Sequence, residues 1–145
     1  MLTVDIYNKT RTRVRTKLFT DLLRPAEKYL AKEKIIMRQQ QFLIELTLIG
    51  ESQMRALNQQ YHNKNRPTDV ISLSYFLPRM HDPFVGEIFI CIAYARKQAR
   101  EIRQSLSEEV RFLFIHGLLH IFGYDHEKPE DAAHMKKAAN LILGR

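Results

Sequence analysis

Residues 116–126 read HGLLHIFGYDH, and the spacing of their histidines constrains how this part of the chain can fold. His116 and His120 are four residues apart, so on a helix they lie about 40° apart around the axis and can reach one point. His126 cannot join them on a continuous helix, because ten residues carry it roughly 15 Å along the axis and about 80° around it. The helix must therefore end between His120 and His126, and the chain must turn back. Gly123 suits that turn, since glycine adopts the left-handed conformation that closes a helix.

Three histidines brought to one point predict a metal site at the end of a core helix. Three neutral imidazoles leave one tetrahedral position of a zinc ion open, which is typical of catalytic rather than structural zinc. We therefore expect one Zn²⁺ per chain, held by His116, His120 and His126. The alternative is that His116 and His120 only cap or pack a helix. Three of the chain's six histidines fall on a known ligand spacing, however, and this favours the metal.

The same spacing occurs in the long zinc-protease signature H-E-x-x-H-x-x-G-x-x-H, but the glutamate is missing. In a peptidase that glutamate is the general base. Gly117 occupies its position here, so a metallopeptidase is the weaker interpretation of the motif.

Outward from this motif, the chain shows strand and helix patterns that suggest one α+β domain over residues 1–145. Alternating apolar residues predict strands at 2–8 and 41–50, and apolar runs predict two more within DVISLSYFL and VGEIFICI. Helical spacing predicts helices over 18–32, 52–61 and 93–104, a helix capped by Ser107 that runs through RFLFIHGLLHIF, and a last helix over 129–143. We expect a mostly antiparallel or mixed sheet of about four strands, packed with about five helices.

The composition is that of a basic globular protein, with 45% apolar and 27% charged residues and a formal net charge of +7. This balance favours polyanionic partners, nucleic acid first, although many soluble proteins are basic without one. Cys91 is the only cysteine, which excludes an internal disulfide and favours a reducing compartment. The N-terminus lacks the plan of a signal peptide, and no apolar run approaches the length of about 20 residues that spans a bilayer. We expect a cytoplasmic protein.

The chain resembles the YbeY family of bacterial single-strand endoribonucleases in three segments, HGLLHIFGYDH, RPTDVIS and VGEIFI. The pattern H-G-x-L-H-x-x-G-Y-D-H is highly specific to that family, and the resemblance extends from about Leu46 to the end of the chain. It implies a zinc-dependent endoribonuclease of ribosomal RNA maturation and ribosome quality control, with zinc on the three histidines. The implied partners are RNA, ribosomal RNA first, and the ribosome or its proteins.

The residue after Tyr61 departs from the family pattern. Members usually carry arginine directly after the tyrosine of L-N-x-x-Y, whereas LNQQYH places His62 there. His62 can contact phosphate as a cation or relay a proton as a neutral imidazole, but it lacks arginine's bidentate fork. Arg66 or Lys64 in the same loop can substitute for the family arginine. We expect metal-activated water to attack phosphorus while these cations hold the phosphate. Asp125 and Glu87 are candidates to assist proton transfer, and Asp125 can instead orient a ligand or cap the helix end.

A basic stripe is predicted on the helix over 93–104. Arg96, Arg100 and Arg103 recur at i, i+4 and i+7, opposite an inward side formed by Ala93, Ala95, Ala99 and Ile102. Such a stripe suits an RNA backbone, and a merely solvated face is the alternative. Besides the metallopeptidase, a second rival function stays open at this point: a ribosome-associated RNA-binding factor with little catalysis, in which zinc is mainly structural.

Overall fold

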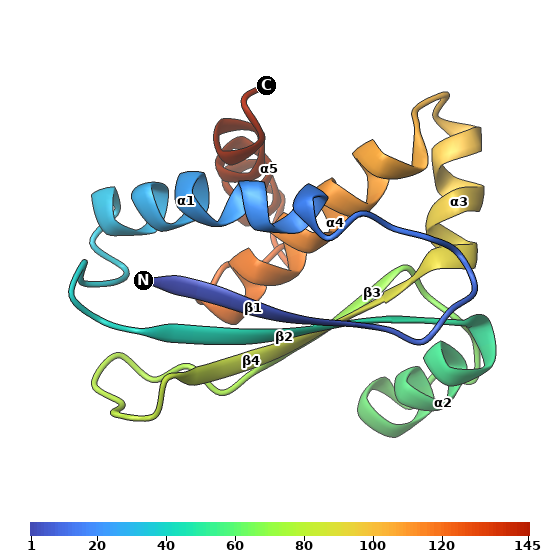
Figure 1. Ribbon diagram of the computed structural model, residues 1–145, viewed down its shortest axis with the longest axis horizontal. Coiled ribbons are helices and arrows are strands. Elements are labelled where there is room, and N and C mark those ends of the chain that lie inside the picture. Colours follow the sequence, from blue (N-terminus) through green and yellow to red (C-terminus); the bar gives the residue numbers. More distant parts are fainter.

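The computed structural model describes residues 1–145, which form four strands and five helices (Figure 1). In chain order these are β1 (Leu2–Asn8), α1 (Lys17–Lys32), β2 (Phe42–Ile49), α2 (Glu51–His62), β3 (Val70–Ser74), β4 (Phe84–Cys91), α3 (Ile92–Glu101), α4 (Leu106–Ile121) and α5 (Pro129–Leu143). The predicted α+β class and its numbers of strands and helices are confirmed. None of the helices combines the length and apolar character needed to cross a membrane.

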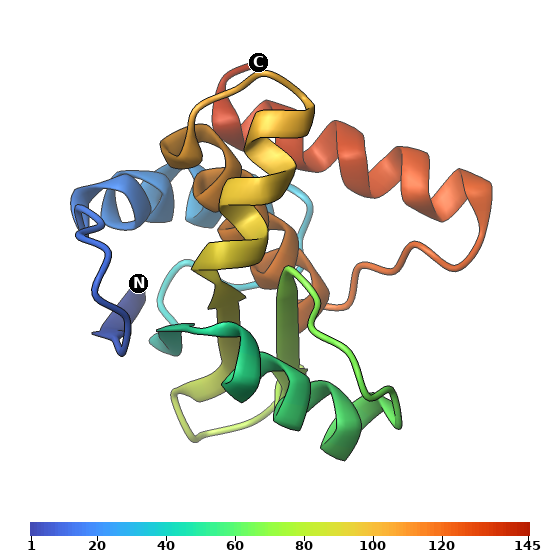
Figure 2. The ribbon, with the colours of Figure 1, turned by 90° about the vertical axis from the view of Figure 1, so that its right-hand side faces the viewer.

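The sheet is mixed, with strand order β1-β2-β4-β3. β1 pairs parallel with β2, β2 pairs parallel with β4, and β3 pairs antiparallel with β4 as an edge strand. Parallel neighbours need a crossover connection, and α1 supplies it between β1 and β2. The segment from α2 through β3 leads from β2 to β4, which leaves β3 and the loop before it at the edge of the sheet (Figure 2).

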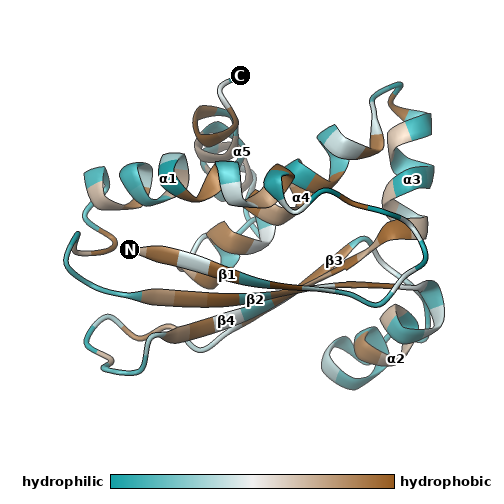
Figure 3. Cartoon of the chain, viewed as in Figure 1, coloured by the Kyte–Doolittle hydropathy of each residue, from teal (hydrophilic) through white to brown (hydrophobic).

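The sheet is covered unequally on its two faces. One face packs against α1 and α4 in a core cluster of 27 buried residues, while α2 covers part of the other face over a cluster of four, Ile49, Met54, Ile71 and Cys91 (Figure 1). Hydrophobic residues are concentrated along the strands between these layers (Figure 3). Cys91 is fully buried, as its apolar surroundings in the sequence suggested.

Helix α4 is the central element of the larger core, and its first turn differs from the prediction. Ser105, not Ser107, is the N-cap, since its hydroxyl accepts a hydrogen bond of 3.1 Å from the Glu108 N–H. At the other end, the Ser74 hydroxyl donates to the Ile121 carbonyl at 2.7 Å. This bond joins the last turn of α4 to the edge strand β3.

The predicted stripe on α3 is only partly correct. The helix ends at Glu101, and Arg103 follows it in a left-handed conformation with φ 56°. Arg103 therefore does not share a helix face with Arg96 and Arg100. Ala95 and Ala99 are buried as expected, but Ala93 is exposed and Ile102 is 61% exposed, so those two positions were wrongly assigned to the inward side.

Candidate metal centre and cleft

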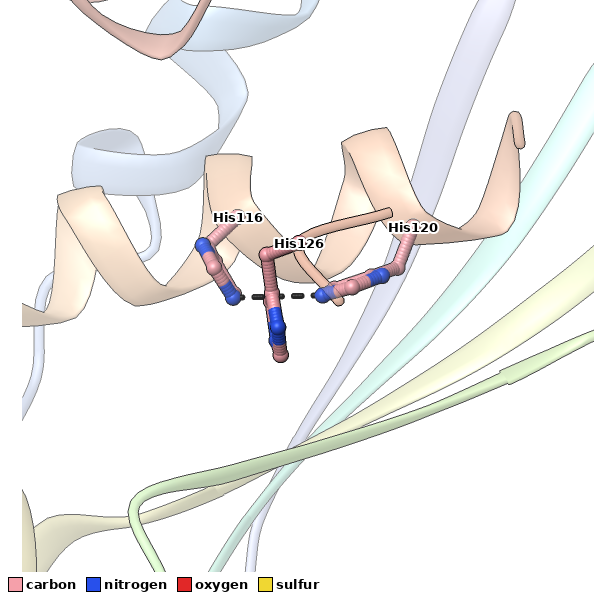
Figure 4. A group of neighbouring side chains, drawn as sticks. All are labelled: His116, His120 and His126. Carbon is pink, nitrogen blue, oxygen red and sulfur yellow. Dashed lines mark hydrogen bonds between the residues drawn. The ribbon is translucent and has the colours of Figure 1, made fainter. Parts of the chain in front are cut away.

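The end of α4 has the turn that the histidine spacing required. The helix stops at Ile121, and Gly123 follows with φ 102°, a backbone conformation that residues other than glycine rarely adopt. The Gly123 N–H donates to the His120 carbonyl at 3.1 Å, and the Tyr124 N–H donates to the Leu119 carbonyl at 3.0 Å. These bonds close the helix and direct the chain back along it. His126 therefore lies beside His116 and His120 (Figure 4).

The three imidazoles fit a metal ion. One ring nitrogen from each histidine lies within 4.8 Å of the others, and Nε2 of His116 is 3.2 Å from Nε2 of His120. A tetrahedral zinc with Zn–N bonds of about 2.0–2.1 Å requires its ligand nitrogens to be about 3.3–3.4 Å apart. The two helical histidines are thus already at ligand spacing. His126 is exposed, so the open side of the cluster faces solvent.

Burial and proximity favour the neutral form of the two helical imidazoles. Burial, followed by the neighbouring His120 and His126, lowers the pKa of His116 to about 4. Burial and then His126 also lower the pKa of His120. A neutral imidazole has a lone pair for a metal, so His116 and His120 do not need to lose protons at neutral pH before they can bind one.

The cluster forms one wall of a polar cleft of about 440 Å³. The other wall comes from the end of α2, the loop after it and the start of β3, and the two walls together are lined by Asn58, His62, Lys64, Arg66, Thr68, Asp69, Val70, Ile71, Ser72 and the three histidines. The structure thus brings His62, Lys64 and Arg66, predicted from the sequence, to the same cleft as the histidines.

Asn58, which the sequence reasoning missed, holds this wall together. It is 3% exposed, its amide nitrogen donates to the Arg66 carbonyl at 2.9 Å, and its amide oxygen is 3.0 Å from Nδ1 of His62. Asn63 ends α2 in a left-handed conformation, which starts the loop that returns to the cleft. The only sequence signal was a polar residue at a position of α2 that faces inward, four residues after the buried Met54.

A second network ties the cleft to α4. Asp69 Oδ1 accepts from the Val70 N–H at 2.7 Å, and its Oδ2 accepts from the Gln98 amide at 3.1 Å. The same amide donates to buried Glu109 on α4 at 3.3 Å, and Gln104 donates to the other oxygen of Glu109. Burial raises the pKa of the Glu109 carboxyl, which these amide donors partly offset. The sequence pattern RPTD does not predict this anchoring role of Asp69.

Glu87 and Asp125 lie apart from the cleft. Gly86 and Ile88 of β4 face α4, so Glu87 between them points to the opposite face of the sheet, where it accepts a hydrogen bond of 2.7 Å from the Tyr75 hydroxyl. Asp125 accepts from the backbone N–H groups of His126 at 2.6 Å and of Glu127 at 3.2 Å. These bonds hold the turn that carries His126, as the orienting alternative expects, and a part in proton transfer stays a prediction.

Gly117 lies where α4 packs tightly against β4, which leaves little room for a protease-like base. A Cβ at this position would lie 3.0 Å from Cγ2 of Ile88, because the residue faces β4 and not the cleft. The side chain of a glutamate here would start inside the core. The missing glutamate therefore follows from the close contact between α4 and the sheet.

The fold and this site define a class: a small α+β protein in which a three-histidine group, able to bind a metal, lies in the wall of a polar cleft. The chain belongs to the YbeY family, whose profile, described as Endoribonuclease YbeY, matches residues 5–145.

Several curated relatives carry the name Endoribonuclease YbeY. The protein of Nautilia profundicola is 46% identical over 84 residues, which are 58% of this chain and 59% of that protein. That of Anaeromyxobacter sp. is 38% identical over 99 residues, 68% of this chain and 52% of that protein. That of Lactococcus lactis subsp. cremoris is 38% identical over 118 residues, 69% of this chain and 72% of that protein. The chain thus spans about half to somewhat over two thirds of the length of these relatives.

Among solved structures, the solution structure of TM1509 from Thermotoga maritima is similar over nearly the whole chain. It superposes with a TM-score of 0.61 at 28% identity, covering 99% of this chain and 90% of that one.

Proposed function

We propose that this protein is a zinc-dependent single-strand endoribonuclease that acts in ribosomal RNA maturation and ribosome quality control. The observation that carries the proposal is the cleft, in which three clustered imidazoles face a loop with two free cations. Membership of the YbeY family supports the reaction class. The lone, buried Cys91 fits a protein of the reducing cytoplasm.

A zinc ion on His116, His120 and His126 would polarise a phosphoryl oxygen and acidify a water molecule, as three-histidine zinc does. The chain's own residues bind and orient the substrate. Lys64 and Arg66 are exposed at the cleft and form no ion pair, so they can neutralise a phosphate. Asp125 keeps the turn of His126 in place through its backbone hydrogen bonds.

A wider basic surface extends the proposed RNA contacts beyond the cleft. The segment after β1 passes beside α3, where the Arg96 guanidinium donates to the Thr12 hydroxyl at 3.0 Å (Figure 1). Arg100 on α3 and the arginines of TRTRVR are exposed, as is Arg103 after the helix. The chain's two ion pairs, Met1–Glu27 and Lys17–Asp21, involve none of these arginines. Unneutralised cations of this kind favour a phosphate backbone.

Two rival functions make different predictions. A metallopeptidase needs a base beside the metal, and the inward position of Gly117 speaks against it. A ribosome-associated RNA-binding factor with little catalysis needs only the basic surface. Metal-free protein that folds and binds RNA, together with pure zinc-loaded protein that cleaves none, would favour that factor.

The test is a cleavage assay on single-stranded and structured RNA, with zinc content measured for each protein. His120→Ala should lose both bound zinc and RNA cleavage, because only two of the three imidazoles remain to hold the metal. His81→Ala is the matched control, since His81 is an exposed histidine in the β3–β4 loop. Cleavage retained by His120→Ala without bound metal would refute the proposal.

A further inference from the structure

The cleft needs a group that can take a proton from the attacking water, and few of its residues are available. The three clustered histidines are committed to the metal, and Lys64 and Arg66 are cations. Asp69 has both carboxylate oxygens occupied by hydrogen bonds, from Val70 and Thr68 on one side and Gln98 on the other. His62 is the remaining titratable side chain of the lining.

Asn58 determines which nitrogen of His62 carries the hydrogen of the neutral ring. The Asn58 amide nitrogen is used by the Arg66 carbonyl, which is an acceptor only, so the amide oxygen must be the atom beside His62. That oxygen can only accept, and Nδ1 of His62 therefore carries a hydrogen. In the neutral ring the lone pair is then on Nε2. Asn58 is 3% exposed and fixed at both ends of its amide, so this tautomer is built into the fold.

We infer that His62 is the general base of the reaction, acting through Nε2, and that Asn58 is its positioning residue. This inference rests on the proposed function. As water attacks phosphorus, the new O–P bond forms and Nε2 accepts a proton from that water. The bond from phosphorus to the leaving ribose oxygen breaks, and that oxygen takes up a proton from solvent. The imidazolium then returns its proton to solvent, so water is added across the phosphodiester.

The assignment separates His62 from the cations beside it. A phosphate anchor needs a permanent positive charge, and Lys64 and Arg66 provide two within the same loop. A base needs a lone pair held in one direction, and the Asn58–His62 hydrogen bond provides that. The charged and titratable groups that share the cleft with His62 are Lys64, Arg66 and Asp69 from its own loop, and His116, His120 and His126 from the other wall.

The test measures kcat and KM for cleavage of a single-stranded oligoribonucleotide by zinc-loaded protein, between about pH 5 and 9. His62→Gln should lower kcat by about 10²-fold or more, the usual contribution of a general base, with unchanged zinc content and little change in KM. His62→Ala should show the same loss. Imidazole in the buffer should restore part of the activity of His62→Ala, and His81→Gln should behave as wild type.

Asn58→Asp tests the positioning role. It keeps an oxygen acceptor and adds negative charge, which favours the imidazolium, so the acidic limb of the pH–kcat profile should move to higher pH. An unshifted limb would contradict the role of Asn58. Full kcat in His62→Gln or His62→Ala, or no rescue by imidazole, would overturn the assignment of His62. Wild-type cleavage and an inactive His120→Ala would leave the proposed function intact. Wild-type protein that cleaves no RNA would refute the proposed function and this inference with it.

Discussion

Replacing Gly117 by alanine tests whether the contact between α4 and β4 excludes a side chain. The added Cβ would lie 3.0 Å from Cγ2 of Ile88 and 3.3 Å from its Cγ1 and Cδ1, and Ile88 is fully buried. Carbon atoms pack best at about 3.5–4.0 Å, so the Ile88 side chain, or the helix and strand together, must shift by a few tenths of an ångström. Overpacking of this kind costs about 1–3 kcal/mol. For a chain of this length, this corresponds to a fall in Tm of roughly 3–10 °C.

Gly117→Glu should cost more, on the order of 4 kcal/mol, because it also buries a carboxylate without a partner. Gly50→Ala is the matched control. A Cβ there meets nothing within 4 Å, so the loss should stay below about 1 kcal/mol. Urea and thermal denaturation of the metal-free proteins measure these differences. The packing argument fails if Gly117→Ala is as stable as Gly50→Ala, or if Gly117→Glu folds normally and hydrolyses peptides.

Three further predictions concern the histidine cluster. The pKa of His116 is lowered to about 4 in the folded protein, so the unfolded chain binds more protons below about pH 6.5. Metal-free protein should therefore lose stability, by at most about 3 kcal/mol, as the pH falls from about 6.5 to 4. In urea titrations over the same pH range, His116→Gln should lose less stability than the wild type. Gly123→Ala should lower the free energy of unfolding by about 1–2 kcal/mol, because φ 102° is unfavourable for alanine. It should also weaken zinc binding in a competition titration. An unchanged zinc affinity would show that this turn does not position His126. Removal of zinc by a chelator should abolish RNA cleavage and lower the Tm. Zinc added back at about 100 times its Kd should restore about 2.7 kcal/mol of stability. A Tm that does not depend on zinc would contradict binding to the folded state.

Features set by neighbours in the chain were predictable from the sequence. β1 has the expected bounds, and α5 starts and ends where predicted, because alternation, proline at a helix start and glycine after its end act locally. The turn between His120 and His126 was predictable for the same reason, since the spacing of the histidines and Gly123 are compatible only with a helix that ends there. Local signals fail where several candidates compete. Ser105 and Ser107 are equally plausible N-caps of α4 from the sequence. No helix-ending residue near Arg103 indicates that α3 ends two residues earlier, at Glu101.

The sequence by itself determined the helix end, the grouping of the three histidines and the basic character of the protein, because these depend on spacing and composition. Only the tertiary structure decided which face each side chain meets. Gly117 faces Ile88 because α4 lies directly on β4, and Glu87 points away from the cleft because that helix covers the opposite face. Asn58 fixes the ring of His62 because the loop after α2 folds back and offers the Arg66 carbonyl to its amide. Such contacts depend on how elements pack, and the pattern within one element does not contain that information.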